Sequence, residues 1–116
     1  MKRKIVKQKP LSPTLREKKR YVVYEVLSDS QISQKASQRL ILQEFKELAG
    51  NLGLGKAGLL FLKDWEEYKG ILRINNKYLD HLRAALCNIQ EKDTLFRSVA
   101  VSGVLKQARI RFSGGR

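Results

Sequence analysis

The chain has 116 residues, of which 42% are hydrophobic and 30% charged, a composition that suits one globular domain and excludes a wholly disordered chain. Its single cysteine, Cys87, excludes a disulfide framework and a cysteine-rich zinc site. No apolar run approaches the roughly 20 residues that cross a bilayer, so we expect a cytoplasmic protein that makes no membrane contact.

The formal charge of +13 is concentrated at the two ends of the sequence. Residues 1–20 hold nine basic side chains against one acidic, residues 94–116 hold five against none, and residues 21–93 are formally neutral. Such ends indicate either simple solvation or attraction to a polyanion through phosphate contacts and counterion release. A membrane surface is disfavoured because residues 1–10 lack an amphipathic face. Nucleic acid is the preferred partner, and charge alone does not separate RNA from DNA.

The first half of the chain predicts an arm, a strand and a helix. Residues 1–17 are basic and contain Pro10 and Pro13, which predicts a flexible arm. Residues 20–27 (RYVVYEVL) favour a strand, and residues 28–30 a turn. Residues 33–49 have the three-and-four apolar spacing of a helix that Gly50 ends. The predicted core positions of this helix are Ala36, Leu40, Ile41, Phe45, Leu48 and Ala49.

The second half predicts a hairpin, a helix, a strand and a short basic helix. The apolar runs 58–65 and 70–75 flank the charged residues 66–69, which is typical of a β-hairpin. Asn76 can cap the next helix. Its predicted buried stripe is Tyr78 or Leu79, Leu82, Ala85, Leu86 and Ile89. Residues 94–102 predict a fourth strand, residues 104–112 a short helix, and residues 113–116 a disordered tail.

The order strand, helix, strand, strand, helix, strand is that of the split βαβ pattern. We therefore expect an α+β fold, a ferredoxin-like (RRM-like) βαββαβ sandwich with a four-stranded antiparallel sheet and two main helices. Residues 18–112 would form this single domain, preceded by the basic flexible arm and closed by the short C-terminal helix.

No catalytic or metal-binding set is visible in the sequence. Residues 50–57 (GNLGLGKA) look like a phosphate-binding loop, but they follow a helix and lead into a strand, whereas such a loop follows a strand and opens a helix. They predict a flexible or interacting loop. His81 has no second histidine or cysteine at ligand spacing, which favours a solvated helix position. The acidic residues form no paired constellation.

Aromatic residues for base stacking are scarce where an RNA recognition motif would have them, on its first and third strands. Tyr21 and Tyr24 lie on the first strand but on opposite faces, so one must be core, and residues 71–74 of the third strand contain no aromatic. Backbone contacts by basic side chains are therefore favoured over base reading. Arg73 should point to the open sheet face, and Arg20, Arg73 and Arg97 can form one surface with the basic terminal segments.

Three stretches, residues 70–86 (GILRINNKYLDHLRAAL), 94–108 (TLFRSVAVSGVLKQA) and 18–27 (KKRYVVYEVL), resemble the archaeal and eukaryal processing-of-precursor family of ribonuclease P protein component 2. The resemblance covers most of residues 18–112. It implies a protein subunit of an RNA-based enzyme that removes the 5′ leader from precursor tRNA. The chemistry would be performed by Mg²⁺ ions held by the RNA, with no cofactor bound by this chain and no catalytic residue in it.

The resemblance also implies the partners: ribonuclease P RNA, the TIM-barrel protein component 3 docked on an apolar helix face, other protein subunits and, indirectly, precursor tRNA. A contact between two copies of the chain is a further partner hypothesis. The predicted RNA-binding residues are Lys18, Lys19, Arg20, Tyr21, Arg73, Lys77, Arg97, Ser98, Lys106, Arg109 and Arg111.

Two alternatives remain open at this point. A ribosomal or other generic RNA-binding protein of the same fold would bind many structured RNAs equally and need no partner. A small acylphosphatase-like hydrolase would need an anion-binding loop after the first strand, and residues 27–33 (LSDSQIS) have neither glycine nor arginine for one.

Overall fold

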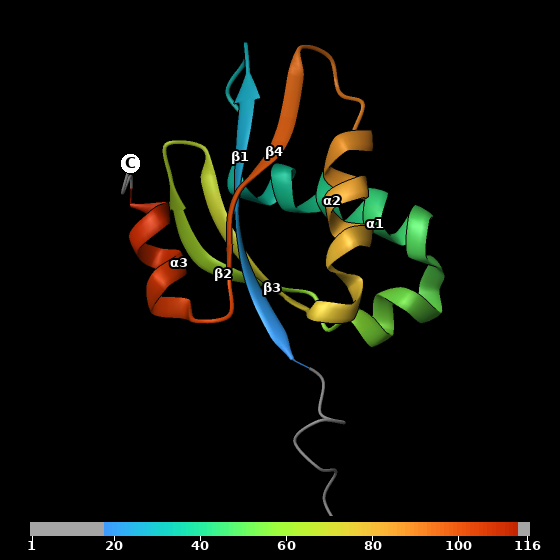
Figure 1. Ribbon diagram of the computed structural model, residues 1–116. Coiled ribbons are helices and arrows are strands. Elements are labelled where there is room, and N and C mark those ends of the chain that lie inside the picture. Colours follow the sequence, from blue (N-terminus) through green and yellow to red (C-terminus); the bar gives the residue numbers. More distant parts are fainter. Residues whose placement is uncertain (1–17, 114–116) are drawn as a thin grey trace, which may run out of the picture.

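The computed structural model describes residues 18–113. Its elements follow the predicted order, with a short 3-10 helix, η1, added before the second main helix (Figure 1). The bounds are β1 Lys19–Ser28, α1 Gln34–Ala57, β2 Leu60–Glu66, β3 Lys69–Asn75, η1 Asn76–Tyr78, α2 Leu79–Asn88, β4 Thr94–Ser102 and α3 Leu105–Phe112. The arm predicted for residues 1–17 and residues 114–116 of the predicted tail lie outside the described residues.

The four strands form one antiparallel sheet in the order β2-β3-β1-β4, so β1 and β3 are its central strands. This order, with helices in both crossovers, is that of the ferredoxin-like fold and confirms the predicted α+β class. In the central pair, Tyr21 lies opposite Arg73 and Tyr24 lies opposite Gly70. The register fixes which side chains share a face of the sheet.

The two faces of the sheet carry separate hydrophobic clusters. On the inner face, Val22, Tyr24 and Leu72 pack with residues of α1 and α2. On the outer face, Val23 and Ile71 pack against α3, which lies on the opposite side of the sheet from α1 and α2 (Figure 1). The C-terminal helix thus covers part of the face that an RNA recognition motif presents to bases. The predicted stripe of α2 is confirmed, since Leu82, Ala85, Leu86 and Ile89 are all buried.

Helix α1 begins as predicted but continues beyond its predicted end. Ser33 caps it, its Oγ accepting a hydrogen bond from the backbone N–H of Ala36 at 3.1 Å. Gly50, with φ 78° and ψ 172°, kinks the helix instead of ending it, so the loop predicted for residues 50–57 is wrong. The helix resumes because Gly53 and Ala57 are small enough to be buried there, and it ends at Gly58 in the left-handed conformation.

The buried face of α1 agrees with the prediction at most positions. Ile41 and Phe45 are fully buried, and Leu40 and Ala49 pack against the same cluster. Leu48, predicted as core, is instead 42% exposed. The buried stripe runs through Ser37, Ile41, Phe45 and Ala49 at a spacing of four, and Leu48 lies beside this stripe and not on it.

The predicted hairpin of β2 and β3 is confirmed, and its turn has unusual chemistry. Glu67 and Tyr68 have φ of 54° and 61°, the geometry of a type I′ turn, which glycine and asparagine adopt most easily. After β3, the predicted cap of the second main helix at Asn76 is wrong, because Tyr78 precedes α2 without a side-chain cap bond and the side-chain cap belongs to the short helix η1. Asn75 is the capping residue, because its Oδ1 accepts the backbone N–H of Lys77 at 3.1 Å and lets η1 begin.

Tyr24 is the largest fully buried side chain and gives the domain a pH-sensitive contact. Burial raises the pKa of its phenol to about 12, against a smaller opposing effect of the hydrogen bond with Ser37. The unfolded chain, with a tyrosine pKa near 10, loses this proton first as the pH rises. The contribution of Tyr24 to stability is therefore complete below pH 10 and is lost between about pH 10 and 12.

We expect the free energy of unfolding to fall by about 1 kcal/mol between pH 9 and 11 through this residue. Urea denaturation of the unmodified chain and of Tyr24→Phe at both pH values measures this fall. The phenylalanine ring cannot ionise, and the other titrating groups are common to both chains, so the difference between them is due to Tyr24. Between the two pH values, the free energy of unfolding of the unmodified chain should fall by that amount more than the free energy of unfolding of Tyr24→Phe. Equal pH dependence would mean that the Tyr24 phenol is not shielded from ionisation.

Candidate nucleic-acid interface

One end of the sheet brings together the start of β1, the end of β3 and the end of β4. Lys19 pairs with Asn75, and the carbonyl oxygen of Lys18 accepts the backbone N–H of Asn76 at 2.7 Å. Tyr21 pairs with Ser102 of β4, just before α3 begins. The C-terminal part of α1 reaches the same end, since Gly58 lies beside the Nζ of Lys19. Residues 1–17 join the chain at this end through Lys18.

This end carries most of the net positive charge of the described domain. We define the basic end by seven side chains, Lys18, Lys19, Arg20, Lys56, Arg73, Lys77 and Lys106. Asp80, in the first turn of α2, is the acidic side chain of the described range that lies nearest to them along the sequence, three residues after Lys77. The remaining residues between 18 and 113 hold ten basic and nine acidic side chains and are close to neutral. Folding therefore brings together basic side chains that lie up to 88 positions apart in the sequence, from Lys18 to Lys106.

Arg73 lies at the centre of the basic end, on the outer face of β3. Its neighbours Leu72 and Ile74 are buried in the inner cluster, which confirms the predicted direction of Arg73. It lies between Tyr21 of β1 and Leu60 of β2. Its Nε is buried and has no hydrogen-bond partner within the described chain. A donor in that state costs about 1 to 3 kcal/mol, which an anionic oxygen would offset.

Lys56 was missed by the sequence reasoning because it lies in the segment interpreted as a loop. The structure places it on the last turn of α1, where it lines a groove of about 440 Å³ with Lys77, Tyr78 and His81. His81 is exposed, as predicted, and its ring lies 5.2 Å from that of Tyr78. The four-residue spacing of the small residues Gly53 and Ala57, which are both buried, is the sequence signal that would have predicted this last part of α1.

Two of the other predicted RNA-binding residues, Arg97 and Arg109, are held by carboxylates. Arg97 donates from Nε and Nη2 to the Glu25 carboxylate at 2.9 and 2.8 Å, and Arg109 holds Asp64 at 3.1 and 3.3 Å. These pairs join β4 to β1 and α3 to β2, so a carboxylate lies beside each of the two exposed guanidinium groups. Arg111 is exposed on α3. The surface predicted to join Arg20, Arg73 and Arg97 is therefore not continuous in charge, because Glu25 lies beside Arg97.

Neither tyrosine of β1 offers an open stacking surface. Tyr24 is 1% exposed in the inner cluster, which confirms that one of the two is core. Tyr21 is half-buried against the cluster under α3. Ser98 pairs with Tyr24, so it belongs to the inner side of the sheet, opposite to Arg97. The arrangement suits contacts with phosphates rather than readout of stacked bases.

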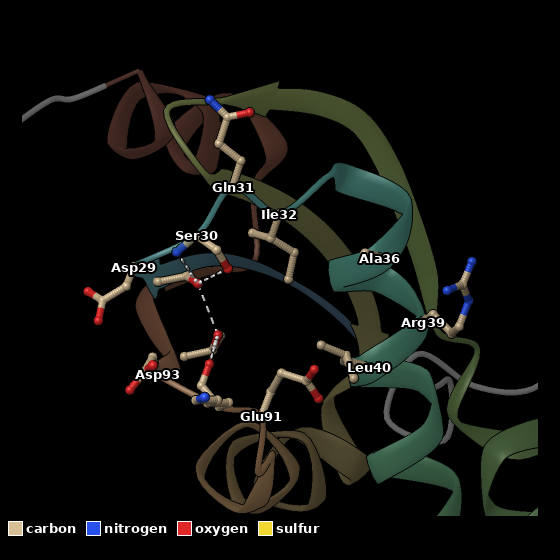
Figure 2. Close-up of a pocket in the computed structure, with 12 residues that line it drawn as sticks. Asp29, Ser30, Gln31, Ile32, Ala36, Arg39, Leu40, Glu91 and Asp93 are labelled. Carbon is tan, nitrogen blue, oxygen red and sulfur yellow. Dashed lines mark hydrogen bonds between the residues drawn. The ribbon is translucent and has the colours of Figure 1, made fainter.

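The opposite end of the sheet has a different character. Residues 28–32 and 91–94 line a pocket of about 550 Å³, in which the Ser28 hydroxyl is within 3.0 Å of that of Thr94 (Figure 2). Asp29, Glu91 and Asp93 border it, with Arg39 and Lys92 as the basic members. Figure 2 shows the Asp29 and Asp93 side chains directed away from the cavity. The loop after the first strand, residues 29–33, contains neither the glycine nor the arginine that binding the anion of an acylphosphatase-like substrate would need.

Two other kinds of feature are missing between residues 18 and 113. No group of three or more His, Cys, Asp or Glu side chains is arranged to hold a metal ion there. In the same range, no helix combines the length and the apolar character needed to cross a bilayer.

Together, the sheet order and the clustered cations define a class of protein: a ferredoxin-like domain with one strongly basic end. Comparison with known proteins narrows this class. Residues 20–113 match the Rpp14/Pop5 family. "Ribonuclease P protein component 2" of Pyrococcus abyssi is 34% identical over 111 residues, covering 92% of this chain and 94% of that protein. The protein of the same name from Methanococcus vannielii is 37% identical over 107 residues, covering 90% and 82%.

A solved structure supports the fold independently of close sequence similarity. A chain in the cryo-EM structure of yeast ribonuclease MRP superposes with a TM-score of 0.62 at 16% identity, covering 81% of this chain and 79% of that one. From the match to its family and the identity to these relatives, this chain belongs to the Rpp14/Pop5 family. The resemblance seen in the sequence is confirmed.

Proposed function

We propose that this chain is a protein subunit of ribonuclease P that binds the catalytic RNA and stabilises its folded core for removal of the 5′ leader from precursor tRNA. The observation that carries the proposal is family membership over residues 20–113 together with nearly full-length similarity to ribonuclease P protein component 2. The clustered cations supply the chemistry that such a role needs, because phosphate contacts dominate protein affinity for RNA.

The reacting groups would belong to the RNA. Mg²⁺ ions held by the RNA would activate the water and stabilise the leaving oxygen, as two-metal sites do in phosphoryl transfer. The role of this chain would be electrostatic, since cations at the surface reduce the repulsion between RNA segments that must pack together. It would work in the cytoplasm with precursor tRNA contacted through the RNA.

A protein partner would dock on an apolar helix face. Helix α1 exposes Leu42, Leu48 and Leu52 to 40%, 42% and 73%. Exposed leucines supply apolar area that a partner protein can bury. The TIM-barrel protein component 3 is the partner that the family resemblance implies. A contact between two copies of this chain is a separate hypothesis, which sedimentation of the purified chain tests.

The proposal is tested by RNA selectivity. The affinity of the purified chain for its cognate ribonuclease P RNA is compared with that for ribosomal RNA fragments of equal length, at one stated salt concentration. We expect at least about tenfold tighter binding to the cognate RNA, because a specific complex adds fitted contacts to the general electrostatic attraction. Equal affinity for both would favour the generic RNA-binding alternative.

A further inference from the structure

We propose that the RNA docks end-on, across the basic end rather than along the outer sheet face, and that the groove between α1 and α2 holds an RNA phosphate between Lys56 and Lys77. This inference rests on the proposed function and adds to it an orientation and a binding site. Lys56 and Lys77 come from different elements, α1 and η1, and both side chains line this groove.

The distribution of charge favours this orientation. The basic end has seven cations against Asp80, whereas the loops at the opposite end carry Asp29, Glu66, Glu67, Glu91 and Asp93. Arg39, Lys69 and Lys92 lie among these five acids and offset them only in part. In the field of a polyanion such a domain is oriented with its cations toward the phosphates. The acidic loops would then face away from the RNA.

Unpaired donors give a second argument that does not depend on charge counting. On β3, the side chains of Arg73 and Asn75 share one face, and Arg73 Nε and Asn75 Nδ2 are buried without an acceptor in the described chain. Both lie at the basic end. Asn75 is fully buried, whereas Arg73 is partly exposed, and most buried donors in proteins are hydrogen-bonded, so the orphan Nε of Arg73 indicates a side chain that gains an acceptor on binding. Phosphate oxygens are acceptors without donors of their own.

The sheet face is less suitable as the primary contact. Two arginines on this face, Arg97 and Arg109, are held by Glu25 and Asp64, and a third, Arg73, lies where the face meets the basic end. An approaching phosphate would have to compete with each carboxylate or meet its repulsion. Helix α3 covers the central part of this face through Ala108 and Phe112. The groove of Lys56 and Lys77 has neither obstacle.

The test compares two double variants that remove the same charge. Lys56→Gln/Lys77→Gln changes the groove, and Lys46→Gln/Lys92→Gln removes two exposed lysines elsewhere, on α1 and in the loop before β4. Binding of each full-length chain to the cognate ribonuclease P RNA is measured over a series of salt concentrations. Each lost phosphate contact lowers the salt slope by about one. The groove variant should lose about one to two from its slope and at least about tenfold in affinity, and the matched variant should lose little.

The outcomes separate the inference from the function on which it rests. Equal losses in the two variants, or no loss in either while the unmodified chain binds selectively, would overturn the end-on orientation and leave the proposed function standing. Failure of the unmodified chain to select the cognate RNA would instead overturn the proposed function. Circular dichroism of both variants checks that neither change has unfolded the domain.

A second readout does not depend on charge. In a Cys87→Ser background, a hydroxyl-radical-generating iron chelate is attached at Asn76→Cys, at the basic end, or at Ser30→Cys, in the loop after β1; all three positions are exposed. Cleavage of the bound RNA from position 76 and little from position 30 would support end-on docking. Stronger cleavage from position 30 would refute it.

Discussion

Gly70→Ala should destabilise the domain by about 1 to 3 kcal/mol, the range typical of an overpacked core. A Cβ at position 70 would lie 2.5 Å from the Oη and 2.6 Å from the Cζ of Tyr24. The ring of Tyr24 cannot move away easily, because it is 1% exposed and lies 6.4 Å, between ring centroids, from both Phe61 and Trp65. Thermal unfolding followed by circular dichroism measures the loss, and a fall in Tm of about 5 °C or more is expected.

Gly55→Ala is the matched control, since it makes the same chemical change where nothing lies within 4 Å of the new Cβ. Gly55 is in α1, so alanine should raise helix propensity and stabilise the chain by up to about 1 kcal/mol. The two substitutions are thus expected to have opposite signs. Destabilisation by both, or by neither, would mean that the Tyr24 contact does not explain why residue 70 is glycine.

Arg73→Met should weaken binding to the cognate RNA by at least about tenfold while leaving the folded domain as stable as before, or more stable. A hydrogen bond to a charged group contributes about 1.5 to 3 kcal/mol, which accounts for the loss of affinity. Methionine keeps a long apolar stem between Tyr21 and Leu60 and removes the buried, unpaired Nε, which accounts for the stability. Filter binding and urea denaturation measure the two effects separately.

Two comparisons make this prediction specific to Arg73. Arg83→Met removes an exposed arginine from α2, away from the predicted binding residues, and should change affinity little. Arg73→Lys keeps the charge and loses the planar donor group, so its affinity should lie between those of the unmodified chain and Arg73→Met. A large loss of stability in Arg73→Met would show that Arg73 serves the fold instead of the RNA.

Local pattern was sufficient to predict most of the fold. The β-branched and aromatic residues of 20–27 predict a strand and the apolar spacing of residues 79–89 predicts a helix, and both elements are found where expected. The errors lie where tertiary packing overrides local preference. Gly50 marks a kink rather than a helix end, because Gly53 and Ala57 find space to pack beyond it.

The candidate site was predictable in composition but not in arrangement. Lys18, Arg73 and Lys106 were each identified from charge and position, yet their proximity depends on the pairing of β1 with β3 and β4. The ion pair of Arg97 with Glu25 is a cross-strand contact over 72 positions, which charge counting along the chain cannot show. Lys56 joined the site only because α1 extends to Ala57.

The most direct test of the central claim is cleavage of precursor tRNA by the cognate ribonuclease P RNA at low Mg²⁺ concentration, with the partner protein component 3 present and this chain added or omitted. The account predicts accurate removal of the 5′ leader that requires this chain and is weakened by Arg73→Met. Equal cleavage with and without the chain, at a concentration where it occupies the RNA, would contradict the claim that it is a working subunit of ribonuclease P.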